Sequence, residues 1–338
     1  MITLAQVARQ AGVSTGTASM AMAGNPRVLP ETSRRVHEVA RQLGYTPRRK
    51  RVSDVPKTSG PDTSGGIVMV GVGIEYSRFP VYAQLLQEIG SIASSRGLKF
   101  TSEIARNLQD LRGIISRQKY AGALLLCQDA DEKRMMSEDV IGALPCVRVM
   151  GSFVPDSLLD HVACDHRRVG ELAAEYLWRR GHRVACTIQP NQISNELFRK
   201  RAQAFVEVFE QLGGIASQHY VRGNVEAQKV ARLLASGRPC PTGIFAGTDF
   251  ILSQFDLLFR HLGLIPGKEV ELVGCNKEDH YLDDLDPRPM SIDLRLPVVA
   301  EQAMDLLAWR RQNPRSSRMQ VLVEPQLPES HAQTPASP

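Results

Sequence analysis

Apolar side chains recur at helical spacing from the first residues of the chain. Residues at positions i, i+3, i+4 and i+7 share one face of a helix, and the first such set is Leu4, Val7, Ala8 and Ala11. Thr3 and Gln6 have the spacing of a capping box, in which each side chain bonds the backbone N–H of the other residue. Gly12 can adopt the left-handed backbone that ends a helix. The pattern therefore predicts a short helix almost at the N-terminus.

A second short helix is predicted directly after it, because Ser14 is suited to cap a helix start. Three apolar positions of this helix can turn inward: Ala18, Ala21 and Met22. The positions left for the other face are Thr15, Gly16, Thr17, Ser19 and Met20. Met20 either packs inward or is exposed, and its place opposite Ala18 and Met22 favours exposure.

A third helix is predicted to begin near Pro30 and to stop at Gly44. Its apolar stripe is Val36, Val39, Ala40 and Leu43. Three helices with a short turn between the first two are typical of a helix-turn-helix, whose second helix can enter the major groove of DNA.

Beyond residue 66, apolar runs of strand length alternate with helical patterns. The expected strands are 67–72, 98–104, 122–127, 146–150, 162–165, 184–188, 243–246 and 271–275. The expected helices are 82–95, 108–117, 133–142, 168–180, 196–212, 227–236 and 251–262. Such alternation is typical of parallel sheets covered by helices. The predicted fold is an all-α three-helix headpiece followed by an α/β core of two doubly wound parallel-sheet lobes.

Composition shifts divide the chain into four segments. We expect a headpiece at 1–47, a basic hinge and flexible linker rich in Ser, Gly and Pro at 48–66, and a two-lobed core at 67–325. The segment 326–338, rich in Pro, Ser, Gln and Glu, is expected to be a disordered tail.

Positive charge is concentrated at the start of the chain. Residues 1–51 hold nine Lys or Arg and two Glu, a net charge of +7, whereas the other 287 residues have a net charge of −2. An inert three-helix bundle would not need this concentration, but a surface that faces DNA phosphates does. We therefore interpret the headpiece as a DNA-binding domain.

Several other classes of protein have little support. At 338 residues and 43% apolar content the chain can bury a sizeable core, and it has neither a membrane-length apolar run nor a signal peptide, so we expect a cytoplasmic protein that does not bind membranes. The six scattered cysteines are expected to be buried free thiols.

An enzyme is also not expected. Gly71-Val72-Gly73 lacks the third glycine of a dinucleotide fingerprint, and Pro266-Gly267-Lys268 lacks the spacing of a phosphate loop. No pair of histidines has metal-ligand spacing, so neither a metal nor a cofactor is expected.

The headpiece resembles that of the lactose-repressor/galactose-repressor (LacI/GalR) family of transcriptional regulators, and the similarity extends more weakly to about Pro325. The matching run is Thr3-Leu4, Val7-Ala8, Ala11-Gly12-Val13-Ser14, Thr17, Ser19, Asn25-Pro26-Arg27-Val28, Thr32, Arg35-Val36 and Leu43-Gly44-Tyr45-Thr46-Pro47. The resemblance implies a core like that of periplasmic sugar-binding proteins. It also implies three chain crossings between the lobes, which we place near Cys164, Leu294 and Val323.

The resemblance also assigns roles to headpiece residues. Thr15, Gly16 and Met20 occupy the positions that read bases in the family. The hydroxyls of Ser14, Thr15, Thr17 and Ser19, at the start of the second helix, are expected to contact phosphates, and Thr3 is a further DNA-binding candidate. Further backbone contacts are expected from Asn25, Arg27, Arg34 and Tyr45. Because neither Gly16 nor Met20 can form bidentate bonds to a base, readout should depend on Thr15 and on apolar contact with a thymine methyl.

The hinge departs from the family pattern. Asp54 stands where family members carry a leucine that wedges into the minor groove, and a carboxylate cannot take that place. Arg48, Arg49, Lys50 and Arg51 are therefore expected to hold DNA electrostatically. If they help to neutralise about six to ten phosphates per dimer, affinity should fall about 10³- to 10⁵-fold between 50 and 200 mM salt.

Arg201 is the residue that the resemblance places in an effector cleft between the lobes. It lies in Arg201-Ala202-Gln203-Ala204-Phe205, where the family carries Arg followed three residues later by Gly-aromatic, and its alternative role is that of a surface arginine. A guanidinium suits paired sugar hydroxyls or a carboxylate. Further cleft candidates are Phe79, Tyr82, Phe153, Asp165, Thr248, Asp249, Phe250 and Asn276.

Asn276 stands where the family usually has an aspartate. Without that carboxylate, Arg201 should make the cleft more positive than in most members, which favours an acidic sugar or a phosphorylated ligand. The sequence thus predicts a homodimeric, ligand-responsive regulator, by analogy a repressor, that binds a near-palindromic operator in double-stranded DNA. The alternative is a DNA-binding dimer whose core senses no small molecule or responds to a protein partner.

Overall fold

A computed structural model describes residues 3–22, 28–43, 65–73, 79–117, 120–127, 132, 144–155, 157–191, 196–237 and 239–328. The chain divides into two compact units, Met1–Gly60 and Pro61–Pro338. The expected helix at 133–142 lies outside the described residues, as does most of the expected hinge and tail.

The described part of the first unit forms three helices: α1 (Leu4–Gln10), α2 (Thr15–Met22) and α3 (Pro30–Gln42). The expected capping box is present, because the Gln6 side chain accepts the Thr3 N–H at 2.8 Å and the Thr3 hydroxyl accepts the Gln6 N–H at 3.4 Å. Gly12 has a φ of +67°, which a glycine adopts without strain, and so lets the chain turn between α1 and α2.

Small apolar side chains hold these helices together. The buried set is Val7, Ala8, Ala11, Ala18, Ala21, Val28, Val36 and Ala40, and Val13, Met22, Val39 and Leu43 pack against it. Alanines at the contacts let α1 and α2 approach closely, so this small unit still has its own apolar core.

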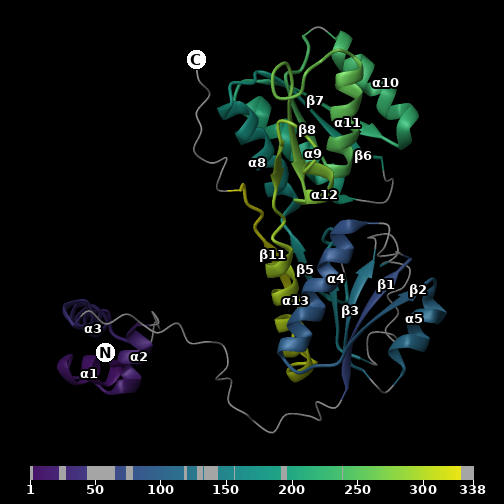
Figure 1. Ribbon diagram of the computed structural model, residues 1–338. Helices are drawn as coiled ribbons and strands as arrows, with labels where there is room; N and C mark the ends of the chain where they lie inside the picture. Colours follow the sequence, from purple (N-terminus) through teal and green to yellow (C-terminus); the bar gives the residue numbers. More distant parts are fainter. Residues whose placement is uncertain are drawn as a thin grey trace. The chain divides into compact units, whose positions relative to one another are not determined.

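The second unit consists of two lobes (Figure 1), and the first lobe, the N-lobe, is built on a six-stranded parallel sheet. Its strand order is β11-β5-β4-β3-β1-β2. The strands are β1 (Gly66–Val72), β2 (Phe100–Ala105), β3 (Tyr120–Cys127), β4 (Cys146–Val149), β5 (Asp160–Cys164) and β11 (Gln320–Val323). The described helices of this lobe are α4 (Pro80–Ser95), α5 (Leu108–Ile115) and α13 (Leu296–Gln312). Helix α13 packs against α4 and against β3, β4 and β5.

The second lobe, the C-lobe, is built on a five-stranded parallel sheet of order β10-β9-β8-β6-β7. Its strands are β6 (Val184–Pro190), β7 (Ile215–Val221), β8 (Gly243–Ala246), β9 (Glu271–Cys275) and β10 (Met290–Ile292). Its helices are α8 (His166–Arg179), α9 (Glu196–Gln211), α10 (Gly223–Ser236), α11 (Asp249–His261) and the short α12 (Asp279–Leu282).

Among the described residues, three segments of chain join the two lobes. The first runs from β5 into α8, the second from β10 into α13, and the third leaves β11. The first and third lie side by side, since the Asp165 N–H donates to the Val323 carbonyl at 2.9 Å. Asp293 and Gln326 exchange two backbone hydrogen bonds of 3.0 Å, so Gln326, which we assigned to the tail, is part of the ordered core.

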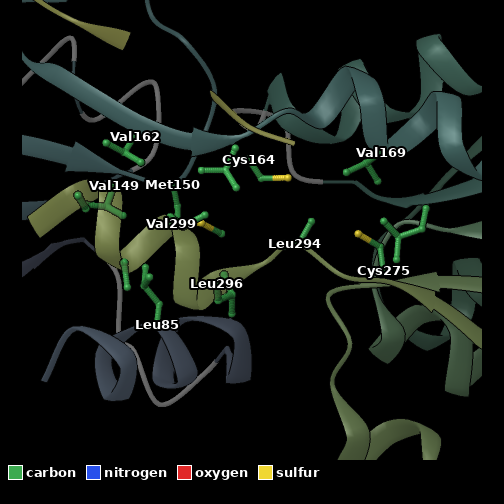
Figure 2. Close-up of a cluster of buried hydrophobic side chains, with 14 of the residues drawn as sticks. Leu85, Val149, Met150, Val162, Cys164, Val169, Cys275, Leu294, Leu296 and Val299 are labelled. Atoms are coloured by element: carbon green, nitrogen blue, oxygen red, sulfur yellow. The ribbon is translucent and has the colours of Figure 1, made fainter. Parts of the chain in front are cut away.

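An apolar core runs through the junction of the lobes (Figure 2). Val149, Val162 and Leu296 belong to the N-lobe side of this cluster, and Val169 and Cys275 to the C-lobe side. Leu294, in the second crossing, lies between the two groups and is 1% exposed. The crossing segments are therefore held by packing as well as by hydrogen bonds.

All six cysteines are free thiols, and the expected burial holds for five of them, whereas Cys240 is half-buried. In the described ranges, no helix combines the length and apolar character needed to cross a membrane.

Candidate DNA-reading helix and interlobe cavity

Helix α2 starts at a serine cap. The Ser14 hydroxyl accepts the Thr17 N–H at 3.0 Å and lies 2.9 Å from the Thr17 hydroxyl oxygen, while the Ser14 carbonyl accepts the Ala18 N–H at 2.9 Å. The hydroxyls and free N–H groups of this helix start can meet phosphate oxygens, as at other helix N-termini.

The outer face of α2 carries the three expected base-reading residues. Ala18 and Ala21 are fully buried, whereas Thr15, Gly16 and Met20 are exposed. Met20 is 41% exposed, so its side chain does not pack inward, which was the alternative to exposure. A Cβ added at Gly16 would lie 3.7 Å from the Ser14 Oγ, so a larger residue fits there without a clash.

The remaining DNA-contact candidates are only partly covered by the structure. Arg34 is exposed on α3, and Thr17 is half-buried at the start of α2. The Thr3 side chain is exposed and caps α1. The side chain of Ser19 and the residues Asn25, Arg27, Tyr45, Arg48, Arg49, Lys50 and Arg51 lie outside the described set.

A cavity of about 440 Å³ lies between the two lobes. Its walls include residues that directly follow the carboxyl ends of strands: Met150 after β4, Asn191 after β6, Arg222 after β7 and Asn276 after β9. Open parallel sheets usually bind ligands at this edge. The volume is within the range of small-molecule sites.

Both lobes contribute to the cavity wall. From the N-lobe come Phe79, Pro80, Val81, Tyr82, Met150 and Gly151. From the C-lobe come His166, Pro190, Asn191, Leu197, Phe198, Arg201, Val221, Arg222, Gly223, Asn224, Thr248, Phe250, Ile251, Gln254, Asn276, Glu278 and Tyr281. Leu294 of the second crossing completes the described lining.

Six of the nine effector candidates lie in this wall: Phe79, Tyr82, Arg201, Thr248, Phe250 and Asn276. Phe153, Asp165 and Asp249 are absent from the described lining. Asp165 instead caps α8, where its carboxylate accepts the N–H groups of Arg167 and Arg168 at 3.0 and 3.1 Å. The Phe153 side chain is 46% exposed outside the cavity wall.

Arg201 is buried, with 2% exposure, and is not the surface arginine of the alternative interpretation. Its Nη1 donates to the Gly247 carbonyl at 2.5 Å, and its Nη2 lies 3.3 Å from the Nδ1 of His166. Burial, and then the charge of Arg201, hold the pKa of His166 well below its ordinary value, so this imidazole is neutral. Because a guanidinium only donates, Nδ1 is the acceptor in this contact.

Asp249 lies behind the cavity wall and is fully buried. Its carboxylate accepts the Glu278 N–H at 2.7 Å and the Ser291 hydroxyl at 2.9 Å. Asp249 therefore holds the turn after β9 in place, a supporting role that differs from the direct ligand contact we expected.

Glu278 corrects the expectation of a cavity without a carboxylate. It follows Asn276 by two residues, lines the cavity and is 6% exposed. Burial raises its pKa, and the hydrogen bond from the Asn276 amide opposes this rise. The cavity thus contains an acidic group as well as Arg201 and Arg222, so the argument for an acidic ligand no longer holds. The only sign of this cavity carboxylate in the sequence was a glutamate two positions after Asn276, which replaces the aspartate of the family.

Left-handed backbone conformations gather around the cavity. The non-glycine residues with positive φ in the described ranges are Met150, Asn276, Lys277 and Arg295, at φ values of 65°, 109°, 57° and 57°. Met150 and Asn276 line the cavity, and Lys277 and Arg295 directly follow the lining residues Asn276 and Leu294. Such backbone strain is concentrated at functional sites in proteins.

Aromatic rings stand in the wall on both sides. Phe79 and Tyr82 pack edge to face with ring centroids 5.5 Å apart, and Phe250 and Tyr281 do so at 5.6 Å. Phe79 and Phe250 are partly exposed, with 38% and 52% of their surface accessible. A ligand with flat apolar faces can lie against these rings while polar groups from the strand ends bond its edge. Among the described residues, no group of three or more His, Cys, Asp or Glu is placed to hold a metal ion.

Sequence profiles match both parts of the chain. The profile of "Bacterial regulatory proteins, lacI family" matches residues 3–48, and that of "Periplasmic binding protein-like domain" matches residues 174–329. The transcriptional repressor PurR of Yersinia enterocolitica is 22% identical over 339 residues, which cover 97% of this chain and 96% of that protein. The transcriptional regulator CelR of Thermobifida fusca is 30% identical over 191 residues, 55% of each chain.

Solved structures share the fold. A complex of the regulator CelR with cellobiose aligns with a TM-score of 0.67 at 23% identity, covering 97% of this chain and 98% of that one. The lac repressor dimer bound to operator and the anti-inducer ONPF aligns with a TM-score of 0.62 at 19% identity, covering 96% and 97%. The predicted fold class is confirmed, and the named relatives are regulators, as expected for a chain that is not an enzyme. The chain is therefore a member of the LacI family of transcriptional regulators, with a helix-turn-helix domain followed by a periplasmic-binding-protein-like core.

Proposed function

We propose that this protein is a ligand-responsive repressor, which binds a near-palindromic operator as a homodimer and takes a sugar-like effector into the interlobe cavity. The observation that carries the proposal is the presence, in one chain, of an exposed reading face on α2 and a cavity walled by both lobes. A ligand that contacts both lobes favours one of their relative positions, and this change can alter the spacing of two headpieces on DNA.

The DNA-binding half of the proposal rests on the surface of α2 and on charge. Thr15, Gly16 and Met20 are exposed while Ala18 and Ala21 hold the helix on its core, so the reading residues are free to meet base edges. The +7 charge of residues 1–51 supplies the attraction to phosphates. A target in chromosomal DNA places the protein in the cytoplasm.

The effector half of the proposal rests on the chemistry of the cavity. Amides of Asn191, Asn224 and Gln254 both donate and accept hydrogen bonds, and aromatic rings stand beside them. This combination suits a polyhydroxylated ring with apolar faces. Because Glu278 supplies a carboxylate and the Arg201 guanidinium already bonds the Gly247 carbonyl and His166, an uncharged sugar is favoured over a uronate or a sugar phosphate. The similar protein CelR is known as a complex with cellobiose, a neutral sugar.

The dimer is supported by two considerations. A near-palindromic operator matches a protein with twofold symmetry, and two headpieces double the number of base contacts. The lac repressor, which shares this fold, is a dimer in its operator complex.

Thermal denaturation of the full-length protein against neutral sugars, uronates and sugar phosphates tests the effector. A ligand present at 100 times its dissociation constant should stabilise the protein by about 2.7 kcal/mol. We expect at least one neutral sugar to do so and to change the affinity for DNA. If the protein binds a specific DNA site but no compound stabilises it, the alternative of a core that responds to a protein partner is favoured.

A further inference from the structure

Helix α4 of the N-lobe has no cap of its own. Its N-cap residue is Phe79, whose side chain cannot accept a hydrogen bond, and Pro80 follows in the first turn. The first backbone N–H groups of a helix need partners from outside the helix. The partner of the Val81 N–H is the carboxylate of Glu278, whose Oε1 accepts it at 3.1 Å.

This hydrogen bond joins the two lobes. Val81 lies in the first turn of α4, the N-lobe helix that follows β1, and Glu278 lies in the C-lobe between β9 and α12. The two residues are 197 positions apart in the sequence, and both line the cavity. None of the three crossing segments contributes to this contact, so it exists only in a state in which the lobes are close together.

The turn that carries Glu278 is held in place from the C-lobe side. The Glu278 N–H donates to the Asp249 carboxylate at 2.7 Å, and the Asn276 amide donates to the Glu278 Oε2 at 3.2 Å. Asn276 and Lys277, which directly precede it, both have left-handed backbone conformations. A strained turn with this support fixes the direction of the carboxylate toward α4.

The cost of burying the Glu278 carboxylate is offset only when the lobes are close together. Burial raises the pKa of Glu278, which means that the folded protein pays to keep this group ionised. A carboxylate at a helix N-terminus recovers part of that cost through a charge-assisted hydrogen bond and the helix dipole. The recovery ends when the lobes separate, so the carboxylate favours the closed state.

We propose that Glu278 is a latch between the lobes, which closes the cavity by capping α4 from the opposite lobe. The inference rests on the proposed function insofar as lobe closure is what transmits the signal to DNA. Each carboxylate oxygen has two lone pairs, and the contacts to Val81 and Asn276 use one on each oxygen. The remaining positions can accept a hydroxyl of the ligand without release of Val81, so a donor-rich ligand can bind while the latch stays closed.

Hydrogen exchange of the Val81 amide in the ligand-free, full-length protein measures the latch directly. Glu278→Met keeps the side-chain size but removes the acceptor, and Glu278→Gln keeps an acceptor without charge. The control is Asp110→Asn, because the Asp110 carboxylate also accepts a backbone N–H, that of Arg106 at 3.1 Å, but within the N-lobe. We expect exchange at Val81 to be at least about tenfold faster in Glu278→Met, intermediate in Glu278→Gln and unchanged in the control.

The distance between the lobes is measured in the same variants. Spin labels on encoded unnatural residues at Ser102 and Gln228, both exposed and in different lobes, leave the cysteines untouched. The proposal requires a longer and broader distance distribution in Glu278→Met than in the wild type and the control. Faster exchange at Val81 without a change in the distance between the lobes would mean that Glu278 only caps α4, and this result would overturn the latch. Identical exchange at Val81 in all variants would also overturn it. Neither result depends on DNA binding, so failure of the latch is distinct from failure of the proposed function.

Discussion

The Asp249 carboxylate accepts a hydrogen bond from the Ser291 hydroxyl at 2.9 Å, and both side chains are buried. Ser291 in turn accepts the Lys277 N–H at 3.0 Å, while Asp249 accepts the Glu278 N–H at 2.7 Å. These two residues therefore hold consecutive backbone groups of the turn that presents Asn276 and Glu278 to the cavity. The shape of the cavity wall depends on a buried acid that does not line it.

Asp249 should make stability depend on pH. Burial raises its pKa from the ordinary 3.8 to about 7, so between these pH values the folded protein keeps a proton that the unfolded chain releases. Its contribution to the free energy of unfolding is therefore largest below pH 4 and falls as the pH rises to about 7. Urea denaturation of the wild type and Asp249→Asn from pH 4 to 8 should show a difference that changes by up to about 1.4 kcal/mol per pH unit. A constant difference would contradict this account.

The buried ion pair between Asp160 and Arg310 should be required for the stability of the N-lobe. Arg310 Nη2 donates to the Asp160 carboxylate at 2.7 Å, and the guanidinium also bonds the carbonyls of Asn313, Ser316 and Ser317. Loss of one partner leaves a buried charge uncompensated, so we expect Arg310→Met to lower the free energy of unfolding by about 3 to 5 kcal/mol. The double variant with Asp160→Leu should recover part of this loss. A loss below about 1 kcal/mol in the single variant would show that the pair is dispensable.

Gly170 sets the approach of α9, the helix that carries Arg201, to α8. A Cβ at Gly170 would lie 2.2 Å from the Arg201 carbonyl oxygen and 2.9 Å from the Phe205 nitrogen, so Gly170→Ala must push the helices apart. We expect a loss of about 1 to 3 kcal/mol or more by denaturation. The matched control is Gly113→Ala in α5, where nothing lies within 4 Å of the added Cβ and where alanine should stabilise the helix by about 0.5 to 1 kcal/mol. Equal effects of the two substitutions would disprove the packing argument.

Met20 should influence which operator is preferred. Its side chain is exposed on α2, so Met20→Arg places a guanidinium where it can bond the O6 and N7 of guanine. Selection from random DNA should then enrich sites that contain guanine at one position of each half-site. Gln10→Arg, at an exposed position of α1, adds the same charge and should strengthen binding without changing base preference. Identical preferences in wild type and Met20→Arg would exclude Met20 from the reading face.

Most of the fold followed from periodicity, but two kinds of element did not. Helix α13 buries one face against α4 and the sheet, but that face includes an arginine, Arg310, while Val298 and Trp309 lie beside it, so the apolar periodicity of the helix is weak. Strand β7 lies at a sheet edge and is largely exposed, so it lacks the apolar run that marks central strands.

The cavity was predictable in part for similar reasons. Arg201 and Asn276 could be found from the family pattern, Arg201 because Phe205 follows it four positions later and Asn276 because it directly follows a recognisable strand. Glu278 could not, because its role depends on a left-handed turn that brings it to α4 from a position 197 residues away. Conversely, Asp165 and Asp249 had the right type and place in the sequence, but helix capping and the support of a turn account for their carboxylates.

The most direct test of the account is quantitative binding of the full-length protein to DNA. Random-site selection should yield a near-palindromic sequence, and fluorescence anisotropy should then give an affinity for it at least about 10³ times that for a scrambled duplex at physiological salt. The substitution Thr15→Asp on the exposed start of α2 should abolish this preference. If no sequence is enriched, or if Thr15→Asp binds the selected site as tightly as the wild type, α2 does not read DNA and the central claim is contradicted.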